Sequence, residues 1–273
     1  QCSKWSFKKL SPDFKWFVQL HRPLFMTTLV IMTAFAGCLE PSSPGESLDL
    51  IVSYDATNGT VIETYEDGEL VERKGVELTF DFSDTTSSGE LIRFGVNLLD
   101  GSPATTIEAD NGSVVSVEFF DHGLYEIALF ALDDNAEQII STMVVRIELR
   151  MEWTQSTTYD PLPMAFNPVP MNEGIPPAVI IIESNIENPE LIENIGGGRE
   201  VEVTWELIDQ GNLACQQQEG HVEEGGIITW KTVHFNTYEA HELAIQYDNG
   251  QDYINVNQSV TYQYEQLETE PNS

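Results

Sequence analysis

Basic residues are scarce in this chain, which has 12 Lys and Arg against 45 Asp and Glu and a formal net charge of −33 over 273 residues. A protein this acidic repels the phosphate backbone, which argues strongly against nucleic-acid binding. Cysteine is also rare, and three cysteines exclude a disulfide-dense scaffold. Apolar residues nevertheless make up 41% of the chain, and with 19 glycines they approach the share typical of folded globular proteins.

The sequence lacks the short motifs that mark common active sites. No H-x-H, H-E-x-x-H or C-x-x-C spacing is present for a metal, and no G-x-S-x-G turn is present for a serine nucleophile. His221, His234 and His241 follow one another in the C-terminal half, but their spacing fits none of these patterns. We expect these histidines to be surface or core residues. The sequence therefore predicts a protein that is not an enzyme and that needs no cofactor.

Calcium is the one ion for which the sequence offers candidate ligands. Several aspartates stand near predicted strand ends, where oxygen ligands could converge as calcium requires, and Asp81, Asp100 and Asp133 are the candidates. No twelve-residue EF-hand loop occurs, and aspartate is common in turns for reasons of backbone hydrogen bonding. A role in turns is therefore the favoured interpretation, with a calcium site as the alternative.

The N-terminal segment has the three parts of a secretory signal. Five of the twelve basic residues precede residue 23, and Asp13 is the only acid before residue 38. An apolar run then covers residues 24–37 and ends in small residues. A helix that crosses a bilayer needs roughly 20 apolar residues, so this shorter run favours a cleaved signal over a permanent anchor. We predict a signal peptide at residues 1–37.

The end of the apolar run reads Phe35-Ala36-Gly37-Cys38. It resembles the lipobox of archaeal and bacterial lipoproteins, in which two small residues precede a cysteine that is lipidated and becomes the new N-terminus. Phe35 departs from the leucine usual in that family. The resemblance implies lipidation of Cys38 and anchoring at the outer face of the cytoplasmic membrane. A plain secretory signal and an uncleaved anchor are the alternatives. Residues 38–47 are rich in Pro, Ser and Glu and are predicted to form a flexible tether.

From residue 48 onward, apolar and polar residues alternate, and no convincing helical pattern occurs. Segments such as 76–82, 125–131 and 201–207 are separated by turns rich in Gly, Asp and Asn, which predicts an all-β fold of tandem immunoglobulin-like β-sandwiches. Six prolines crowd residues 161–177, where strand pairing would lose its donors. We therefore predict a first sandwich at 48–154, a linker or irregular loop at 155–177, a second sandwich at 178–265 and a frayed tail at 266–273.

The first predicted sandwich contains a tyrosine-corner sequence, in which Asp121, Gly123 and Tyr125 match D-x-G-x-Y. Residues 123–133 also fit G-x-Y-x-V-x-L-x-V-x-D. Residues 89–101 fall on G-x-I-x-x-Y-x-W-D-F-G-D-G, with Val96 in place of the tryptophan. Over about residues 70–150 the chain thus resembles a diverged PKD domain, an immunoglobulin-like extracellular module. The resemblance implies contact with proteins or carbohydrates, or simple spacing, without catalysis.

Surface groups of two further kinds are candidates for function. Aromatic residues of the second half could stack on sugar rings, with Trp230 and Tyr238 as the main candidates. Core packing is the favoured role for Trp205, because it alternates with apolar residues. Three sequons permit N-glycosylation, at Asn58, Asn111 and Asn257.

Two functions fit these features. The favoured one is a non-enzymatic cell-surface lipoprotein whose β-sandwiches bind an extracellular protein or glycan, or act as a spacer. The alternative is a carbohydrate-binding accessory subunit of an exported hydrolase, which the aromatic residues of the second half favour. In either case the expected partners are the membrane, through the lipid anchor, and an extracellular protein or glycan.

Overall fold

The computed structural model describes residues 48–190 and 199–272, and these residues belong to one compact unit. The predicted signal peptide, Cys38 and the tether lie outside the described residues. The described part of the chain consists of β-strands and one short 3₁₀ helix, η1 (Ala109–Asn111), so the all-β prediction is confirmed. Among the described residues, no helix has the length and apolar character needed to cross a membrane.

The strands divide into two halves along the chain. Those of the first half are β1 (Asn58–Glu66), β2 (Glu69–Lys74), β3 (Val76–Asp81), β4 (Leu91–Asn97), β5 (Thr105–Glu108), β6 (Val114–Phe119), β7 (Gly123–Asp133) and β8 (Gln138–Thr158). Those of the second half are β9 (Met164–Phe166), β10 (Val179–Glu187), β11 (Val201–Asp209), β12 (Ala214–Val222), β13 (Ile227–His234), β14 (His241–Asn249) and β15 (Ile254–Gln263).

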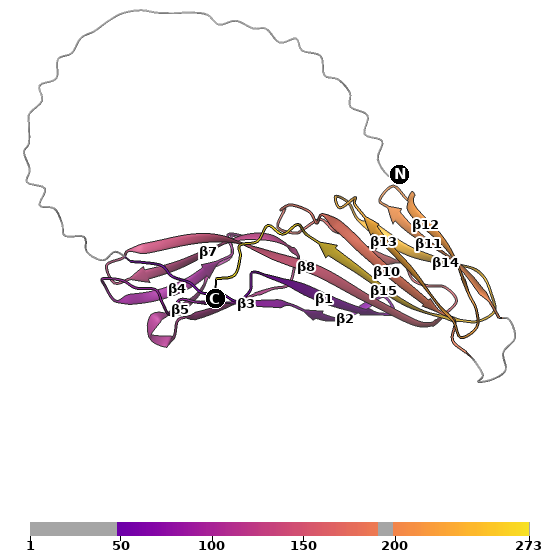
Figure 1. Ribbon diagram of the computed structural model, residues 1–273, viewed down its shortest axis with the longest axis horizontal. Helices are drawn as coiled ribbons and strands as arrows, with labels where there is room; N and C mark the ends of the chain where they lie inside the picture. Colours follow the sequence, from indigo (N-terminus) through magenta and orange to yellow (C-terminus); the bar gives the residue numbers. More distant parts are fainter. Residues whose placement is uncertain (1–47, 191–198, 273) are drawn as a thin grey trace, which may run out of the picture. The chain divides into compact units, whose positions relative to one another are not determined.

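These strands form one large sheet and two smaller ones (Figure 1). The large sheet has the order β13-β10-β15-β8-β7-β4-β5, and β1 joins it at β8 and carries β2. In the first half, the β3-β6 sheet packs on the β4 side of the large sheet, where the rings of Phe82 and Phe94 stack with centroids 5.2 Å apart. In the second half, the β12-β11-β14-β9 sheet covers the β13-β10-β15 part of the large sheet.

Strand β8 is 21 residues long and belongs to both halves. Its first part pairs with β7 and its last part with β15, both antiparallel, while β1 pairs with it in parallel from Arg146 to Thr154. Since β1 overlaps both pairings, β7 and β15 lie end to end along one edge of β8 and β1 follows the other. The strand contains neither Gly nor Pro, and its inward residues from Met143 to Trp153 are buried, which favours one uninterrupted strand.

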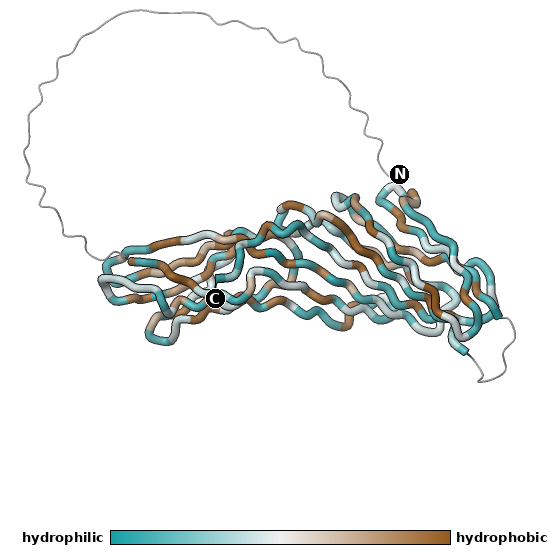
Figure 2. The backbone as a smooth tube through the Cα atoms, in the orientation of Figure 1, coloured by the Kyte–Doolittle hydropathy of each residue, from teal (hydrophilic) through white to brown (hydrophobic). Residues whose placement is uncertain are grey.

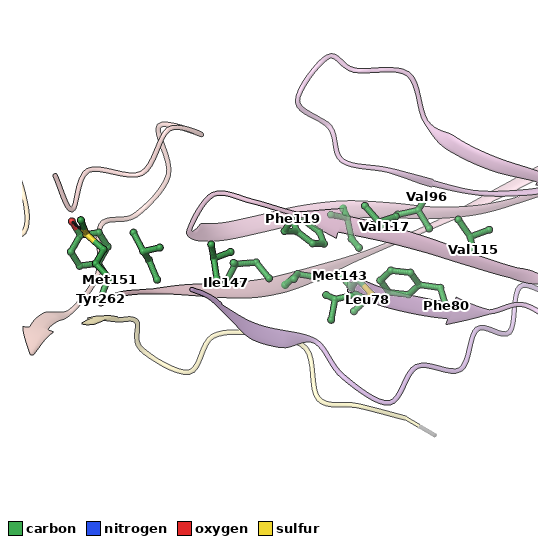
Figure 3. Packing of buried hydrophobic residues seen from close by; sticks show 14 of the residues in the cluster. Leu78, Phe80, Val96, Val115, Val117, Phe119, Met143, Ile147, Met151 and Tyr262 are labelled. Atoms are coloured by element: carbon green, nitrogen blue, oxygen red, sulfur yellow. Dashed lines mark hydrogen bonds between the residues drawn. The ribbon is translucent and has the colours of Figure 1, made fainter. Parts of the chain in front are cut away.

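The core follows from the alternation of side chains, which Figure 2 shows as alternating brown and teal along the strands. One buried cluster runs through both halves, and Figure 3 shows Met143, Ile147 and Met151 of β8 spread along it between Phe80 and Tyr262. A second cluster lies between the two sheets of the second half. The halves therefore share a sheet and part of a core.

The predicted linker at 155–177 differs from the structure in two places. Residues 155–158 continue β8, and Met164–Phe166 form β9, which pairs with β14. Met164 and Phe166 are buried in the shared cluster. The prolines of this segment lie on either side of β9, which is three residues long and forms the edge of its sheet. Since β9 itself contains no proline, all of its backbone N–H groups remain available for pairing.

The tail predicted to fray, 266–273, is instead fixed to the first half over its described residues. Thr269 N donates to Val144 O at 3.0 Å, and Val144 N donates to Thr269 Oγ1 at 3.0 Å. Arg146 Nη2 donates a hydrogen bond to Glu268 Oε1 at 2.8 Å, and Asn272 Nδ2 donates to the backbone carbonyl of Val52. Strand β1 begins to pair with β8 only at Arg146, so the backbone groups of Val144 on that edge need another partner, which the tail supplies.

Candidate functional site

Four connections of the second half meet at one end of its sheets, which we call the distal end. Register places it where β8 ends and β15 begins, because Thr158 pairs with Ile254. Segment 159–163, the described parts of the connection from β10 to β11, and loops 223–226 and 250–253 lie at this end. Loops at the end of a rigid sandwich commonly carry binding groups.

Three tyrosines, Tyr159, Tyr247 and Tyr253, form a cluster at the distal end, which we call the tyrosine cluster. The ring of Tyr159 makes edge contacts with Tyr247 and Tyr253 at centroid distances of 6.0 and 6.5 Å. Tyr159 is 56% exposed, whereas the other two are half-buried. Burial raises the pKa of the Tyr247 phenol, which therefore stays protonated as a donor. The cluster thus presents one exposed ring packed against two half-buried ones.

Charged groups beside the tyrosine cluster are fixed by hydrogen bonds. Tyr247 Oη donates to Asp252 O at 2.6 Å. The Asp252 side chain is 1% exposed, and its carboxylate accepts a hydrogen bond from Arg199 Nη1 at 3.1 Å. Asn188 Nδ2 donates to the backbone carbonyl of Arg199 at 2.8 Å. A Cβ at Gly250 would lie 2.5 Å from Tyr247 Oη, so only glycine lets this hydroxyl reach its acceptor. The exposed guanidinium of Arg199 is therefore held near the cluster.

A second feature of this region is a pocket of about 500 Å³ on the outer face of β11, β12 and β14. Val201, Val203 and Trp205 of β11 point into the core, so the residues between them point outward. Thr204 Oγ1 donates to Asp248 Oδ2 at 2.7 Å. The pocket is lined by Glu202, Val203, Thr204, Glu219, Gly220, His221 and Asp248. It offers mainly acceptors, and Asp248 directly follows Tyr247 on β14.

The two aromatic residues predicted to bind a ligand occupy different environments. Trp230 on β13 is half-buried on the inward side of its strand and packs on Trp205 at a centroid distance of 6.1 Å, so its position fits packing against the core better than the predicted role in binding. Its alternation with Ile228, which also packs against the core, was the signal in the sequence. Tyr238 is 75% exposed, but it follows β13 at the end opposite to the distal end, as the pairing of His234 with Ile180 shows.

The sequence pointed to the aromatic residues of the second half in general, but it did not single out Tyr159, Tyr247 or Tyr253. No spacing in the sequence joins these three residues, because they come from the end of β8, from β14 and from the loop before β15. The local signal is weak as well, since Tyr247 continues the inward alternation of Leu243 and Ile245 and reads as a core residue.

The tyrosine corner has the geometry that its sequence predicts. Tyr125 Oη donates to Asp121 O at 2.8 Å, and burial raises the pKa of Tyr125 to about 12. A Cβ at Gly123 would lie 2.8 Å from Nδ2 of Asn172, so glycine here allows the 171–174 segment to approach. This is a structural device that fixes the start of β7.

The three aspartates proposed for calcium accept hydrogen bonds in separate turns. Asp81 accepts Ser83 N at 2.9 Å, and Asp133 accepts Ser87 Oγ at 2.7 Å. Hydrogen bonds from Ser83 to Asp81, from Ser102 to Asp100 and from the distant Ser87 to Asp133 lower the pKa of each aspartate, which keeps each of them ionised. Within residues 48–190 and 199–272, no three His, Cys, Asp or Glu side chains are grouped as a metal would require. The structure therefore does not bring the three candidates together.

The asparagines of the three sequons are exposed. Asn111 lies in η1, and Asn257 lies on the outer face of the large sheet, in the middle of β15. Asn58 Nδ2 donates to Glu268 Oε1 at 3.2 Å, so a glycan on this nitrogen would displace a contact of the C-terminal segment. Glycosylation of these residues stays a prediction.

The histidines lie on the surface and in the core. His221 is exposed, with its Nε2 3.5 Å from a Glu200 oxygen. His234 and His241 flank the turn between β13 and β14, are buried, and contact each other edge to face at a centroid distance of 4.6 Å. Burial lowers the pKa of His234 to about 4, and the neighbouring His241 adds to this effect. Both imidazoles of this pair therefore belong to the packed interior.

Comparison with known proteins gives no family. No family model matches the sequence, and no curated protein matches it. Among solved structures, a carbohydrate-binding module of the β-sandwich superfamily is similar over 79% of this chain and 97% of its own, with 7% identity and a TM-score of 0.30. The SGBP-B protein of Bacteroides ovatus, solved with a mixed-linkage heptasaccharide, matches over 76% of this chain and 52% of its own, with 9% identity and a TM-score of 0.23.

A structure from Clostridium perfringens ZmpB, which contains a CBM51 domain with bound GlcNAc, matches over 81% of this chain and 49% of its own. Its identity is 11% and its TM-score 0.25. Similarity at this level assigns no function to the chain, so any functional conclusion depends on the distal end itself.

Proposed function

We propose that this protein is a non-enzymatic glycan-binding protein and that the tyrosine cluster is its sugar-binding surface. The observation that carries the proposal is the exposed ring of Tyr159, supported by Tyr247 and Tyr253 beside the fixed guanidinium of Arg199. A pyranose has an apolar C–H face and a rim of hydroxyls. An aromatic ring stacks on the apolar face of the sugar, and charged groups form hydrogen bonds with its hydroxyls.

The chemistry of the distal end fits binding of neutral hydroxylated ligands. The outer pocket, on the opposite face of β14 from Tyr247, offers a second set of acceptors in Glu202, Glu219 and Asp248. Hydroxyl groups donate to carboxylates without the charge repulsion that an acidic ligand would meet on this surface. Stacking and hydrogen bonding require no nucleophile, which supports a role in binding without turnover.

The proposed location is the outer face of the cytoplasmic membrane, with the described residues displayed outside. The lipobox-like sequence that ends at Cys38 supports this location, and the tether at 38–47 would separate the folded unit from the lipid. Intact-mass analysis of the protein extracted from membranes tests it directly. Cleavage before Cys38 with added acyl mass is expected, whereas an unmodified N-terminus would contradict lipid anchoring.

Affinity electrophoresis against a panel of soluble polysaccharides tests the binding function, using residues 46–273, which form the compact unit. Tyr159→Ala should weaken binding at least about tenfold, because it removes the exposed ring, while Tyr159→Phe should retain most of it. Tyr238→Ala is the matched control, because Tyr238 is even more exposed but lies at the opposite end. Equal binding by Tyr159→Ala and the wild type would disprove the assigned surface, and release of sugar products would disprove the non-enzymatic role.

A further inference from the structure

A separate pocket of about 470 Å³ lies beside the tyrosine corner, in the first half. Three segments far apart in the chain form it, namely the turn between β4 and β5, the start of β7, and the segment 171–174. Its lining consists of Leu98, Leu99, Asp100, Leu124, Tyr125, Glu126, Met171, Asn172, Glu173 and Gly174. A pocket of this size accommodates a side chain or a small molecule.

The walls of this pocket are fixed by hydrogen bonds within the chain. Asn172 Nδ2 donates to Leu124 O at 2.9 Å, and Gly174 N donates to Asn172 Oδ1 at 3.0 Å. These bonds hold the 171–174 segment against β7, and the missing side chain of Gly123 leaves room for it. On the opposite wall, Leu99 N donates to Asn97 Oδ1 at 2.9 Å.

The lining combines apolar side chains with negative charge. Leu99 is 52% exposed and Met171 is 80% exposed, which leaves large apolar surfaces open to water in the pocket. Asp100, Glu126 and Glu173 provide three carboxylates, and the lining contains no Lys, Arg or His. Hydrogen bonds from Ser102 lower the pKa of Asp100 and keep it ionised.

We propose that this pocket binds a lysine side chain of a partner protein. A lysine has an apolar four-carbon stem, which would cover Leu99 and Met171, and it ends in an ammonium, which would reach the carboxylates. Charge complementarity selects the cation, and the exposed apolar side chains of Leu99 and Met171 select a ligand with methylene groups over a bare inorganic ion. The role is separate from glycan binding at the distal end and does not depend on it.

The test is a titration of residues 46–273 with a short peptide that carries one lysine, followed through the methyl NMR signals of Leu98, Leu99, Leu124 and Met171. A peptide with norleucine keeps the stem without the charge and is the ligand control. We expect the lysine peptide to shift these signals with saturation, and the norleucine peptide to shift them far less at the same concentration. Equal shifts from both peptides, or none from the lysine peptide, would overturn the proposal.

Variants separate the pocket from the general acidity of the surface. The double variant Glu126→Gln with Glu173→Gln should weaken the lysine peptide about tenfold, since each exposed ion pair contributes a factor of about three. Glu118→Gln is the matched control, because Glu118 is exposed on β6 and is not part of the lining. Equal weakening by the control would mean non-specific attraction and would overturn the proposal. Glucosamine forms a further arm, and tighter binding of this amino sugar than of the peptide would overturn the assignment to a protein partner.

Discussion

Two buried imidazoles should make this protein sensitive to mild acid. His122 is buried at the junction of the halves, where its Nδ1 lies 2.7 Å from Tyr264 Oη, and its ring packs edge-on against Tyr262 at 4.7 Å. Burial lowers the pKa of His122 to about 4, although Asp121 and Glu63 oppose the shift. His234 is buried against His241 and has its pKa lowered to about 4 by the same cause.

The direction of the pH dependence of stability follows from comparing the histidine pKa values of the folded and the unfolded chain. An unfolded histidine has a pKa of about 6.5, so the unfolded chain takes up protons first as the pH falls, and stability is lost between about pH 6.5 and 4. At pH 5 each of the two histidines lowers the free energy of unfolding by about 2 kcal/mol. Together they lower it by about 4 kcal/mol, which is a large share of a typical unfolding free energy. The aspartates with lowered pKa values add their loss only in stronger acid.

Urea unfolding followed by tryptophan fluorescence at pH 7, 6 and 5, at constant ionic strength, measures this effect. The double variant His122→Gln with His234→Gln should be less stable at pH 7 but should lose most of the dependence on pH. His221→Gln is the control, because His221 is exposed, and it should keep the wild-type slope. An unchanged slope in the double variant would refute the argument from burial.

Two further predictions concern stability. A chain that ends at Glu265 should unfold with about 2–4 kcal/mol less free energy than the full chain in urea, because it loses the bonds of Glu268 and Thr269 to the first half; equal stability would mean that the tail frays after all. Tyr125→Phe should cost about 1 kcal/mol in the same assay, since it removes the hydrogen bond to Asp121 O and keeps the ring. Tyr238→Phe, at an exposed site, should cost nothing measurable, and a similar loss in both variants would show that the corner bond is unimportant.

Local patterns were sufficient for the parts of this protein that depend on neighbours in the chain. Alternation along Val201, Val203 and Trp205 predicted which side of β11 is buried, because successive side chains of a strand point to opposite faces. The D-x-G-x-Y sequence predicted the bond from Tyr125 to Asp121 O, because its donor and acceptor are four residues apart. The same alternation predicted that no α-helix forms from residue 48 onward, and the described residues contain none.

The candidate sites were beyond these patterns. The tyrosine cluster joins the end of β8 to β14 and to the loop before β15, and the pocket beside the tyrosine corner needs the 171–174 segment, which reads in the sequence as part of a proline-rich linker. Trp230, one of the two main aromatic candidates from the sequence, is half-buried and packs against the core. Exposure and proximity decide a binding surface, and neither is encoded by residue type alone.

The sequence by itself determined that the chain forms β-strands, which face of strands such as β7 and β11 is apolar, and where one tight corner closes. Tertiary structure decided that β8 serves both halves, that the C-terminal segment returns to the first half, and which aromatic rings meet at the distal end. The bond from Thr57 Oγ1 to Thr269 O joins residues 212 positions apart. Such pairings depend on which backbone edges remain open after the sheets have formed, and that is a property of the whole fold.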